Sequence, residues 1–584
     1  MGAFKKYQLA RKIRVNIHLF LRKLGVPSTY FLDILAVLVG YFTALGAFVF
    51  IEGIEYLEHH SRTFFHSLEN PWIFPLVPAA GGLACGLIVY FFAREAKGHG
   101  IPEVIYAVLM KGGLIRARVA LAKLSATVCS LGTLASAGQE GPIVQIGSAV
   151  GSSLGQSLRL KPDSIKILIG CGAAAGIAAT FNAPIGGVIF ALEVILGTFS
   201  PNVFTPIVIA SVISAVTFHE IRGSDMTFFL NVQYSETIME TLGFALVGIL
   251  CGVIAVIFIR ALERTEKVFA SFRMPAYFKP ALGGLLVGTI IVFYQEVGGN
   301  SYQLVEDLVS ERSFGLYLLL LLLVLKILAT SLTLGSGGSG GIFAPSLVMG
   351  ALVGATVHFS LSQAFEVSSV GIYVMVGMAA FVSGTTHGPI AAILVLCEMT
   401  GHYYFILPLM AGCIMATIVS RSLLDLSIYT IKLYERGIIL KNGHDVDVLK
   451  TYHVCDLMET ETDEVLLNTP LYEVLPIIHD SVHGFVLVRD ASEDVVGVIS
   501  YFELTPFILK DSLDHLAEEA MHTTEDFILE EDPILVAYDK FLMKETSYLI
   551  VRDKRGNFAG IVFKKDIKRS YQKALHQKSL AMIH

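Results

Sequence analysis

Glu140 is an acidic side chain in an apolar part of the sequence, where a charge is energetically costly. It lies within Gly138-Gln-Glu-Gly-Pro142, a segment at the predicted start of an apolar helix. Such stretches rarely hold ionisable groups, and those they do hold usually act on ions or protons. The alternative is a carboxylate that only complements the partial positive charge of a helix start. We expect the first role, an acid group that meets a bound anion or a proton.

Glycine-rich segments that end in proline occur three times, and Glu140 belongs to one of them. They are Gly98-His-Gly-Ile-Pro-Glu103, Gly138-Gln-Glu-Gly-Pro142 and Gly335-Ser-Gly-Gly-Ser-Gly-Gly-Ile-Phe-Ala-Pro345. Proline is accepted in the first turn of a helix, and glycine lets other groups approach the backbone closely. Each segment therefore predicts a helix start whose free N–H groups attract an anion. Close packing of helices alone would explain one such segment better than three.

Other kinds of chemistry find little support. The seven cysteines stand singly without a CxxC pair, so neither a zinc site nor a disulfide framework is expected. The residues 335–340 spell GxGxxG, but they follow a leucine-rich stretch and not a strand, which disfavours a dinucleotide site. No HExxH motif occurs. We expect no enzyme, no metal and no catalytic residues; a membrane-embedded enzyme using Glu140 and His99 is a remote alternative.

The elements that must position these residues are membrane helices. Of 584 residues, 54% are hydrophobic and only 16% charged, against about 25% charged in soluble chains. Apolar stretches follow one another from about 31 to 424, and several are shorter than the ~20 residues that span a bilayer. Short, Gly/Pro-interrupted stretches predict helices that end inside the membrane. We expect an all-α polytopic membrane domain over 31–435.

The two ends of the chain differ from this middle part. Seven Lys or Arg in the segment 1–25 predict an amphipathic helix over 1–30 on the cytoplasmic face of the membrane. The segment 451–584 holds 13 basic and 24 acidic side chains, which predicts a soluble acidic domain after a linker over 436–450. We expect both termini in the cytoplasm, a plasma or inner membrane location and no nucleic-acid partner.

An internal repeat divides the apolar part. The segment Gly138–Gly147 aligns with Gly341–Gly350 at an offset of 203, and Asn182-Ala-Pro184 aligns with His387-Gly-Pro389 at 205. We expect two related halves, about 31–230 and 240–435, with the substrate site at their interface. Glu193 and Glu398 occupy matching places, and we expect both to bond to helix ends at that interface.

The acidic tail repeats as well, at an offset of 63. Met458/Met521, Pro470/Pro533, Asp490/Asp553 and Gly497/Gly560 fall in register. Each unit predicts a short helix and strands, so a small α/β unit is used twice. The tail resembles a tandem pair of CBS (cystathionine-β-synthase-type) domains over 451–570, followed by a short segment, 571–584.

The membrane part resembles a known family of transport proteins. Its GHGIPE, GQEGP and GGIFAP segments, with FNAPIGGVIFALE at 181–193, are similar to signature motifs of the CLC family of chloride channels and proton-coupled chloride transporters. The resemblance implies chloride or a similar small anion as substrate and a homodimer with one anion pathway in each subunit. It also implies two inverted repeats with broken pore helices, and no cofactor.

The resemblance also assigns roles to residues of this chain. Glu140 takes the place of the gating glutamate, which occupies the outer anion site and swings out when protonated or displaced. Tyr429 would close the central site from inside, although Tyr434 is a rival tyrosine. The residues implied to bind the anion are His99, Gly100, Ile101, Gly141, Ile342, Phe343 and Tyr429.

Three positions depart from the family pattern. His99 replaces the usual serine, and Gln139 replaces a basic residue before the gating glutamate. Val194 stands where family exchangers mostly carry a proton-carrying glutamate. A valine cannot carry a proton, so we expect a gated chloride channel. Because some exchangers of the family also lack this glutamate, a proton-coupled chloride exchanger on the same scaffold is the alternative.

The tail matches the nucleotide-binding members of the CBS group only in part. Those members place a Ser or Thr three residues before an Asp. This chain has Ser500 with Glu503 in the first copy and Phe563 with Asp566 in the second. Adenine-nucleotide binding is therefore expected to be weak or absent, and a tail that only stabilises the dimer is an equal alternative.

Overall fold

The computed structural model divides the chain into two units, Met1–Arg436 and Gly437–His584. In the first unit it describes residues 30–223, 237–310 and 314–436. In the second it describes 438–563 apart from 439, 442–443, 446–452, 461, 482–483, 492–493, 510–511, 524–526, 535, 538–539 and 542–547. The expected helix over 1–30, save its last residue, most of the 436–450 linker and the 571–584 segment lie outside the described residues.

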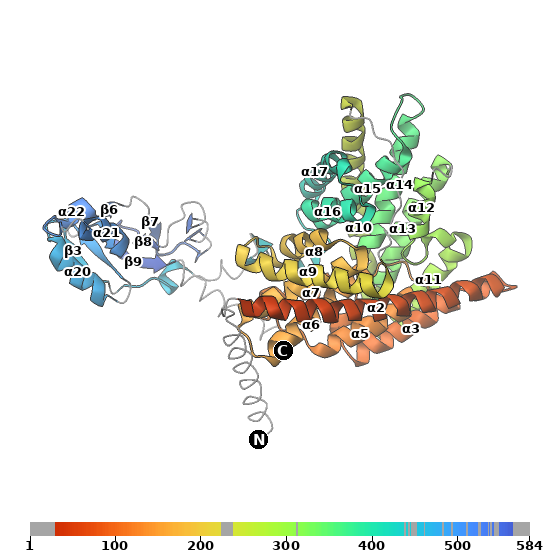
Figure 1. Ribbon diagram of the computed structural model, residues 1–584, viewed down its shortest axis with the longest axis horizontal. Coiled ribbons are helices and arrows are strands. Elements are labelled where there is room, and N and C mark those ends of the chain that lie inside the picture. The colour runs from red at the N-terminus through yellow and green to blue at the C-terminus, as the bar shows by residue number, and fades with distance from the viewer. Residues whose placement is uncertain are drawn as a thin grey trace, which may run out of the picture. The chain divides into compact units, whose positions relative to one another are not determined.

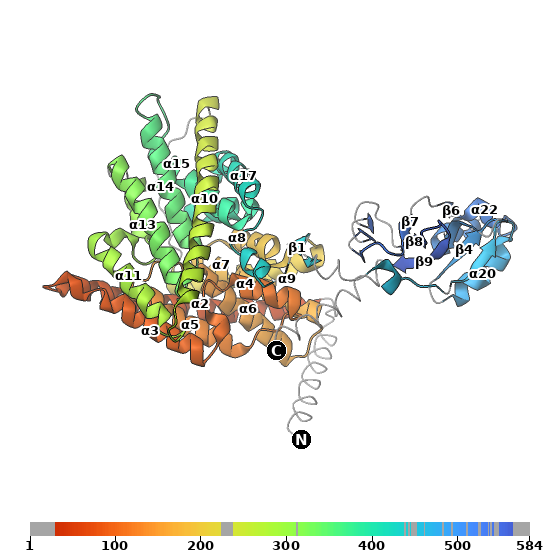
Figure 2. The same cartoon turned by 180° about the vertical axis from the view of Figure 1, so that it is seen from behind.

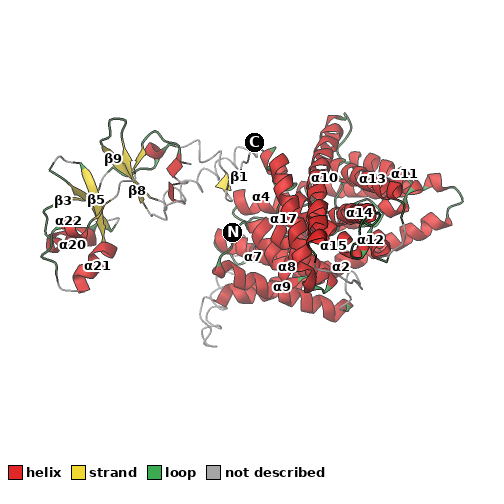
Figure 3. Cartoon of the chain, turned by 90° about the horizontal axis from the view of Figure 1, so that it is seen from above, coloured by secondary structure: helices red, strands yellow, loops and turns green. Residues whose placement is uncertain are grey.

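The described part of the first unit is built from helices (Figure 3). Its first half holds α2 (Phe31–Ser67), α3 (Leu76–Phe91), α4 (Ile101–Met110), α5 (Ala117–Leu131), α6 (Glu140–Ser157), α7 (Pro162–Phe181), α8 (Pro184–Phe190) and α9 (Pro201–Arg222). Its second half holds α10 (Ile238–Ser271), α11 (Lys279–Phe293), α12 (Tyr302–Val309), α13 (Leu316–Gly335), α14 (Phe343–Leu361), α15 (Val370–Thr386), α16 (Pro389–Thr400), α17 (Ile406–Leu423) and α18 (Ile431–Tyr434).

Many of these helices are long and apolar enough for a bilayer. Among the described residues, eight are suited by length and composition to cross a membrane, and five further apolar helices are shorter. The shorter ones include α4, α8 and α16. Each of these three begins with proline at its first or second position after a glycine or alanine. A glycine or alanine followed closely by proline therefore does interrupt the apolar part, as the sequence predicts.

The eight helices described in the first half correspond to the first eight of the second half, α10 to α17. From α2/α10 to α9/α17, the first positions of each pair differ by an offset between 199 and 208. For α6 and α14 the offset is 203. Figures 1 and 2 show the earlier helices on one side of the unit and most of the later ones on the other. The offset seen between the sequence motifs is thus also the offset between the helices that follow them.

Two glutamates join the halves. Glu193 accepts hydrogen bonds from the amides of Ile390 (3.4 Å) and Ala391 (2.8 Å) at the start of α16. Glu398, near the end of α16, accepts from the amides of Ile185 (3.0 Å) and Gly186 (2.7 Å) at the start of α8. These bonds confirm the predicted role of both glutamates. Because each helix end meets the other helix's start, α8 and α16 run antiparallel to each other.

Glycines let the core helices of each half pack closely. A Cβ on Gly147 of α6 would lie 2.1 Å from the carbonyl oxygen of Gly172 in α7. The matching pair in the second half is Gly350 of α14 and Gly377 of α15, where the same distance is 2.1 Å. Small residues at crossing points are typical of membrane helices, where van der Waals contact must hold the helices together.

The second unit contains short helices and small sheets. Its described elements are β1 (Leu440–Lys441), β2 (His444–Asp445), β3 (Glu464–Leu466), α20 (Leu471–Asp480), β4 (Phe485–Arg489), β5 (Val495–Ser500), α21 (Tyr501–Leu509), α22 (Ala517–Ala520), β6 (His522–Thr523), β7 (Phe527–Leu529), β8 (Tyr548–Arg552) and β9 (Phe558–Phe563). The strands β7, β8 and β9 repeat β3, β4 and β5 at an offset of 63. The predicted repeat offset of the tail is therefore present in its strands.

The two copies in the tail share strand pairing and a core. In both, the first strand pairs parallel to the second and the second antiparallel to the third, with a bulge at Val488/Arg489 and again at Val551/Arg552. One apolar cluster draws on both copies and includes Phe485 of β4, Ile550 of β8 and Phe563 of β9. Burial of this shared surface holds the copies together as a pair.

Candidate functional site

The three Gly/Pro segments meet in the middle of the first unit. The amide of Gly138 donates to the carbonyl oxygen of Gly341 (2.8 Å), and the amide of Gly341 donates back to Gly138. The amide of Gly98 donates to the oxygen of Gly338 (3.0 Å), and that of Gly340 to the oxygen of Gly98 (3.3 Å). The helices α4, α6 and α14 therefore begin at one place although they lie far apart in the sequence.

Glu140 is the first residue of α6, and its side chain is only 1% exposed. One carboxylate oxygen, Oε2, accepts a hydrogen bond from the amide of Ala344 (3.3 Å) in the first turn of α14. The other, Oε1, accepts a hydrogen bond from the hydroxyl of Tyr302 (2.8 Å). A negative group thus lies against the helix start that carries the partial positive charge.

Ile342 and Phe343 form the start of α14, with Ile342 as its N-cap and Phe343 as its first residue. Both side chains are buried, and the ring of Phe343 lies 5.2 Å from that of Phe181. Gly141 lies beside them, because a Cβ there would come within 3.3 Å of the Cα of Gly341 and 2.2 Å of the oxygen of His99. The structure therefore brings three of the anion-binding candidates, Gly141, Ile342 and Phe343, to the same place.

Two buried polar side chains face this region without hydrogen bonds. His99 and Tyr429 are each 1% exposed, and their ring centroids lie 5.6 Å apart. Neither ring nitrogen of His99 nor the hydroxyl of Tyr429 has a hydrogen-bond partner among the described residues. A buried polar group without a partner is costly, so these donors are suited to a bound ion or water. Tyr434, the rival of Tyr429, is 52% exposed.

A buried lysine fixes the loop that carries His99. Lys123 of α5 donates from Nζ to the carbonyl oxygens of Ala96 (3.0 Å) and Gly98 (2.5 Å). The loop ends at Gly100, whose φ of +85° is unfavourable for residues with a side chain, and Ile101 then begins α4. His99 thus owes its place to a glycine turn and to a buried lysine that donates hydrogen bonds to the loop.

The comparisons with known proteins place this arrangement in a family. The family model described as "Voltage gated chloride channel" matches residues 81–421, which is more than half of the chain. The chain belongs to the CLC family. It is an integral multi-pass membrane protein, and the function that goes with this family is anion transport.

The relatives of this CLC chain include proteins named as channels. It is 32% identical over 351 residues to a "Putative chloride channel protein ClcB-like" of Ralstonia nicotianae, covering 59% of this chain and 81% of the relative. It is 30% identical over 383 residues to the "Voltage-gated ClC-type chloride channel ClcB" of Escherichia coli K12, covering 64% and 90%. Both relatives are channels by name, and neither is named as an enzyme.

Solved CLC structures include proteins titled as antiporters. A slow cyanobacterial Cl⁻/H⁺ antiporter matches with a TM-score of 0.64 and 28% identity, covering 70% of this chain and 98% of that one. A eukaryotic CLC transporter matches with a TM-score of 0.63 and 20% identity, covering 92% and 99%. The latter likeness concerns the fold alone. Both channels and antiporters thus resemble this CLC chain.

Val194, where the family resemblance leads one to expect a proton-carrying glutamate in most exchangers, lies in a π-helical turn. Val194 belongs to η4, a π-helical segment over Ala191–Leu196 that continues α8. A Cβ on Gly388 would lie 3.0 Å from Val194, which places the valine beside the start of α16. The neighbouring Glu193 uses its carboxylate on the amides of that same helix start. Gln139, another of the three departures, is the N-cap of α6.

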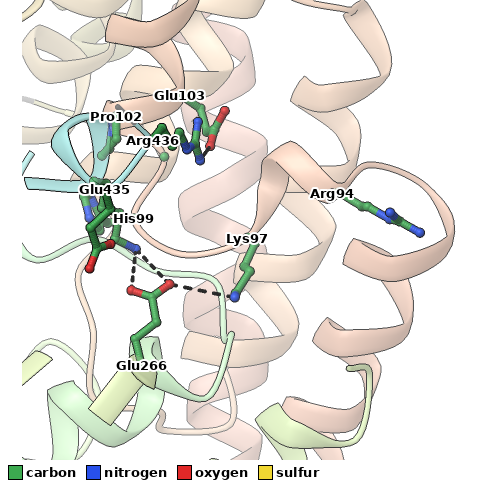
Figure 4. Close-up of a pocket in the computed structure, with 10 residues that line it drawn as sticks. Arg94, Lys97, His99, Pro102, Glu103, Glu266, Glu435 and Arg436 are labelled. Atoms are coloured by element: carbon green, nitrogen blue, oxygen red, sulfur yellow. Dashed lines mark hydrogen bonds and ion pairs between the residues drawn. The ribbon is translucent and has the colours of Figure 1, made fainter. Parts of the chain in front are cut away.

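A cavity of about 190 Å³ lies next to His99 (Figure 4). It is lined by Arg94, Lys97, His99, Gly100, Pro102, Glu103, Glu266, Lys432, Glu435 and Arg436. Glu266 pairs with Lys432 (3.2 Å) and with Lys97 (3.8 Å), and Figure 4 shows the latter link. Arg436 pairs with Glu103. The cavity therefore offers cations that attract anions, and carboxylates that restrain those cations.

The nucleotide candidates of the tail are used within the tail itself. The hydroxyl of Ser500 donates to Glu503, and its amide donates to the same carboxylate (2.9 Å), so the pair caps the start of α21. Glu503 also acts on Tyr548 of β8: burial raises the pKa of this tyrosine to about 12, and the negative charge of Glu503 adds a smaller contribution. Phe563 is buried in the shared cluster, and Asp566 lies outside the described residues.

Sequence reasoning misses the two groups that hold Glu140. The amide of Ala344 and the hydroxyl of Tyr302 bond to its carboxylate, whereas the sequence motifs point to Ile342 and Phe343. A faint signal exists for Tyr302: Gly299-Asn-Ser-Tyr302 matches Gly98-His-Gly-Ile101 at an offset of 201, but the two share only the first glycine. No group of three or more metal-ligating His, Cys, Asp or Glu occurs in the parts of the chain that the structure describes.

Proposed function

We propose that this CLC chain is a gated channel for chloride or a similar small anion, with Glu140 as its gate. The observation that carries the proposal is the contact between the Glu140 carboxylate and the amide of Ala344 at the start of α14. A helix start in a water-poor interior favours a negative group, and chloride is one. The carboxylate and the anion compete for this place, so the anion passes when the carboxylate leaves.

The permeating anion would next meet the groups on the His99 side of Glu140. The amides of Ile342 and Phe343 supply the partial positive charge of the helix start. Because Gly141 has no side chain, the backbone of His99 can lie close to it. The side chains of His99 and Tyr429, which have no hydrogen-bond partner within the described part of the chain, supply hydrogen bonds in place of water. Moderate binding by such neutral donors suits conduction, since an ion that is bound too tightly leaves slowly.

Passive conduction is favoured over proton exchange by Val194. With Glu193 engaged on the α16 amides, this stretch offers no free carboxylate for a proton. The alternative is a proton-coupled exchanger on the same scaffold, because a cyanobacterial Cl⁻/H⁺ antiporter shares this fold. An exchanger would need another relay, for which His99 beside the carboxylate-lined cavity is the first candidate.

Flux from vesicles tests the proposal. Purified protein is reconstituted into vesicles loaded with chloride, and chloride efflux is followed after an outward gradient is imposed. We expect efflux from the wild type and faster efflux from Glu140→Ala, because that variant has no carboxylate to occupy the anion place. Absence of efflux in both proteins, with the chain folded, would contradict the proposed function; equal efflux would contradict the gate alone.

For the tail we propose a cytoplasmic CBS pair in a homodimeric assembly. Support for the paired fold of the tail comes from the strand pattern repeated at an offset of 63 and from the match of a eukaryotic CLC fold over 92% of the chain. Because Ser500 is bonded to Glu503 and Phe563 is buried, we expect weak or no adenine-nucleotide binding. Calorimetry with ATP on the full chain tests this, and micromolar binding would contradict it.

A further inference from the structure

Two buried lysines support equivalent loops in the two halves. Lys123 of α5 and Lys326 of α13 are related by an offset of 203, and both are fully buried. Lys326 donates from Nζ to the carbonyl oxygens of Val297 (3.0 Å) and Gly299 (3.0 Å), as Lys123 does in the loop before α4. The first loop positions His99. Its counterpart, the loop before α12, leads directly to Tyr302, the first residue of that helix.

The loop before α12 is held in an unfavourable conformation. Lys326 also donates to the hydroxyl of Ser301 (2.7 Å), and that hydroxyl donates to the oxygen of Gly298 (3.2 Å). Ser301 has a φ of +61°, which is uncommon for a residue with a side chain. A strained, buried serine that is hydrogen-bonded to a lysine persists only where its surroundings fix it. The next residue, Tyr302, begins α12 with a fixed direction.

Tyr302 ends this chain of contacts at the gate. Its hydroxyl donates to Oε1 of Glu140 at 2.8 Å, whereas the Ala344 amide holds Oε2. We propose that Tyr302 is a positioning residue that holds Glu140 in its closed position, and that Lys326 and Ser301 aim it. This proposal rests on the proposed role of Glu140 as the gate. It adds to that role a second support, which comes from the opposite half of the chain.

The bond has a direct consequence for opening. Glu140 cannot leave the start of α14 without breaking its hydrogen bond to Tyr302. Hydrogen bonds to charged groups are stronger than those between neutral groups, and they are stronger still away from water. Tyr302 therefore raises the chloride concentration at which the anion displaces the carboxylate. Without its hydroxyl, chloride should displace the gate at a lower concentration.

The test compares Tyr302→Phe with a control in two backgrounds. The substitution keeps the ring and removes only the hydroxyl, and Tyr317→Phe, at an 80% exposed tyrosine, serves as the control. Each is made in the wild type and in Glu140→Ala, and flux from vesicles is measured over a range of chloride concentrations. In the wild type we expect Tyr302→Phe to lower the half-saturating chloride about tenfold with little change in maximal flux.

In Glu140→Ala no carboxylate remains, so Tyr302→Phe should change nothing there. Ser301→Gly is a second variant that accepts the positive φ and removes a partner of Lys326; we expect a smaller shift in the same direction. An equal effect of Tyr302→Phe in both backgrounds, or no effect in the wild type, would overturn the proposal. If Glu140→Ala itself behaves like the wild type, the gate assignment fails instead.

Discussion

At the scale of single residues, Glu140 is defined by its charge, and a substitution can remove the charge while keeping the shape. In Glu140→Gln the side chain resembles the protonated acid and cannot ionise. We expect anion flux in vesicles that no longer depends on external pH, because the group that responds to protons is gone. Glu296→Gln, at an exposed glutamate, should keep the full pH response. A Glu140→Gln protein with the wild-type pH response would show that another group gates the flux.

Tyr429 and Tyr434 form a matched pair at the same scale. The hydroxyl of Tyr429 is buried without a partner among the described residues, whereas Tyr434 is 52% exposed. We expect Tyr429→Phe to weaken chloride binding measured by calorimetry about five- to tenfold, as the loss of one hydrogen bond of about 1 kcal/mol predicts. Tyr434→Phe should bind chloride as the wild type does.

Stability separates a ligand role from a structural one for the same pair. Removing a buried hydroxyl that has no partner among the described residues should not destabilise the fold without chloride, since an unsatisfied polar group is lost. Tyr429→Phe should therefore unfold at or above the wild-type temperature in chloride-free buffer. A clear loss of stability there would mean that the hydroxyl serves the fold.

At the scale of helices, Glu193 and Glu398 act as a reciprocal pair of caps. Each carboxylate accepts from two amides at the start of the other half's helix. We expect Glu193→Ala and Glu398→Ala to lower the free energy of unfolding by similar amounts, about 2 kcal/mol each, because hydrogen bonds to charged groups are lost. Thermal unfolding in detergent measures this. Glu220→Ala, at an exposed position of α9, is the control, and a large effect from only one of the two glutamates would contradict the pairing.

What the sequence predicts at this scale depends on how local the signal is. Helix starts at Ile101, Glu140 and Phe343 follow from glycine and proline close by in the sequence, and the strand repeat follows from a fixed offset. The bond between Tyr302 and Glu140 joins residues 162 positions apart, and no local pattern encodes it. The role of Lys326 cannot be predicted for the same reason, since nothing in the leucine-rich sequence around it indicates which groups it bonds to.

At the scale of the whole molecule, the candidate anion site belongs to only one of the two units. All three Gly/Pro segments and the cavity beside His99 lie in the first unit. We therefore expect that deleting residues 451–584 changes gating or assembly and leaves an anion pathway. Chloride efflux from vesicles, with the oligomeric state followed by size-exclusion chromatography, measures both. A folded, dimeric truncation without any anion selectivity would show that the tail helps to form the pathway.

The coupling of anions to protons is also a property of the whole molecule, because a proton must cross from one side to Glu140. Val194 carries no proton, and Glu193 is bonded to the α16 amides. In the cavity, Glu266 and Glu103 are paired with cations, and Glu435 lies 3.8 Å from Lys267. Because these described acids are all engaged, vesicles with a chloride gradient should show anion flux without uphill proton movement, recorded with a pH electrode. An uphill proton signal that disappears in Glu140→Gln would instead make this chain an exchanger, and His99→Ser would then show whether the histidine is its relay.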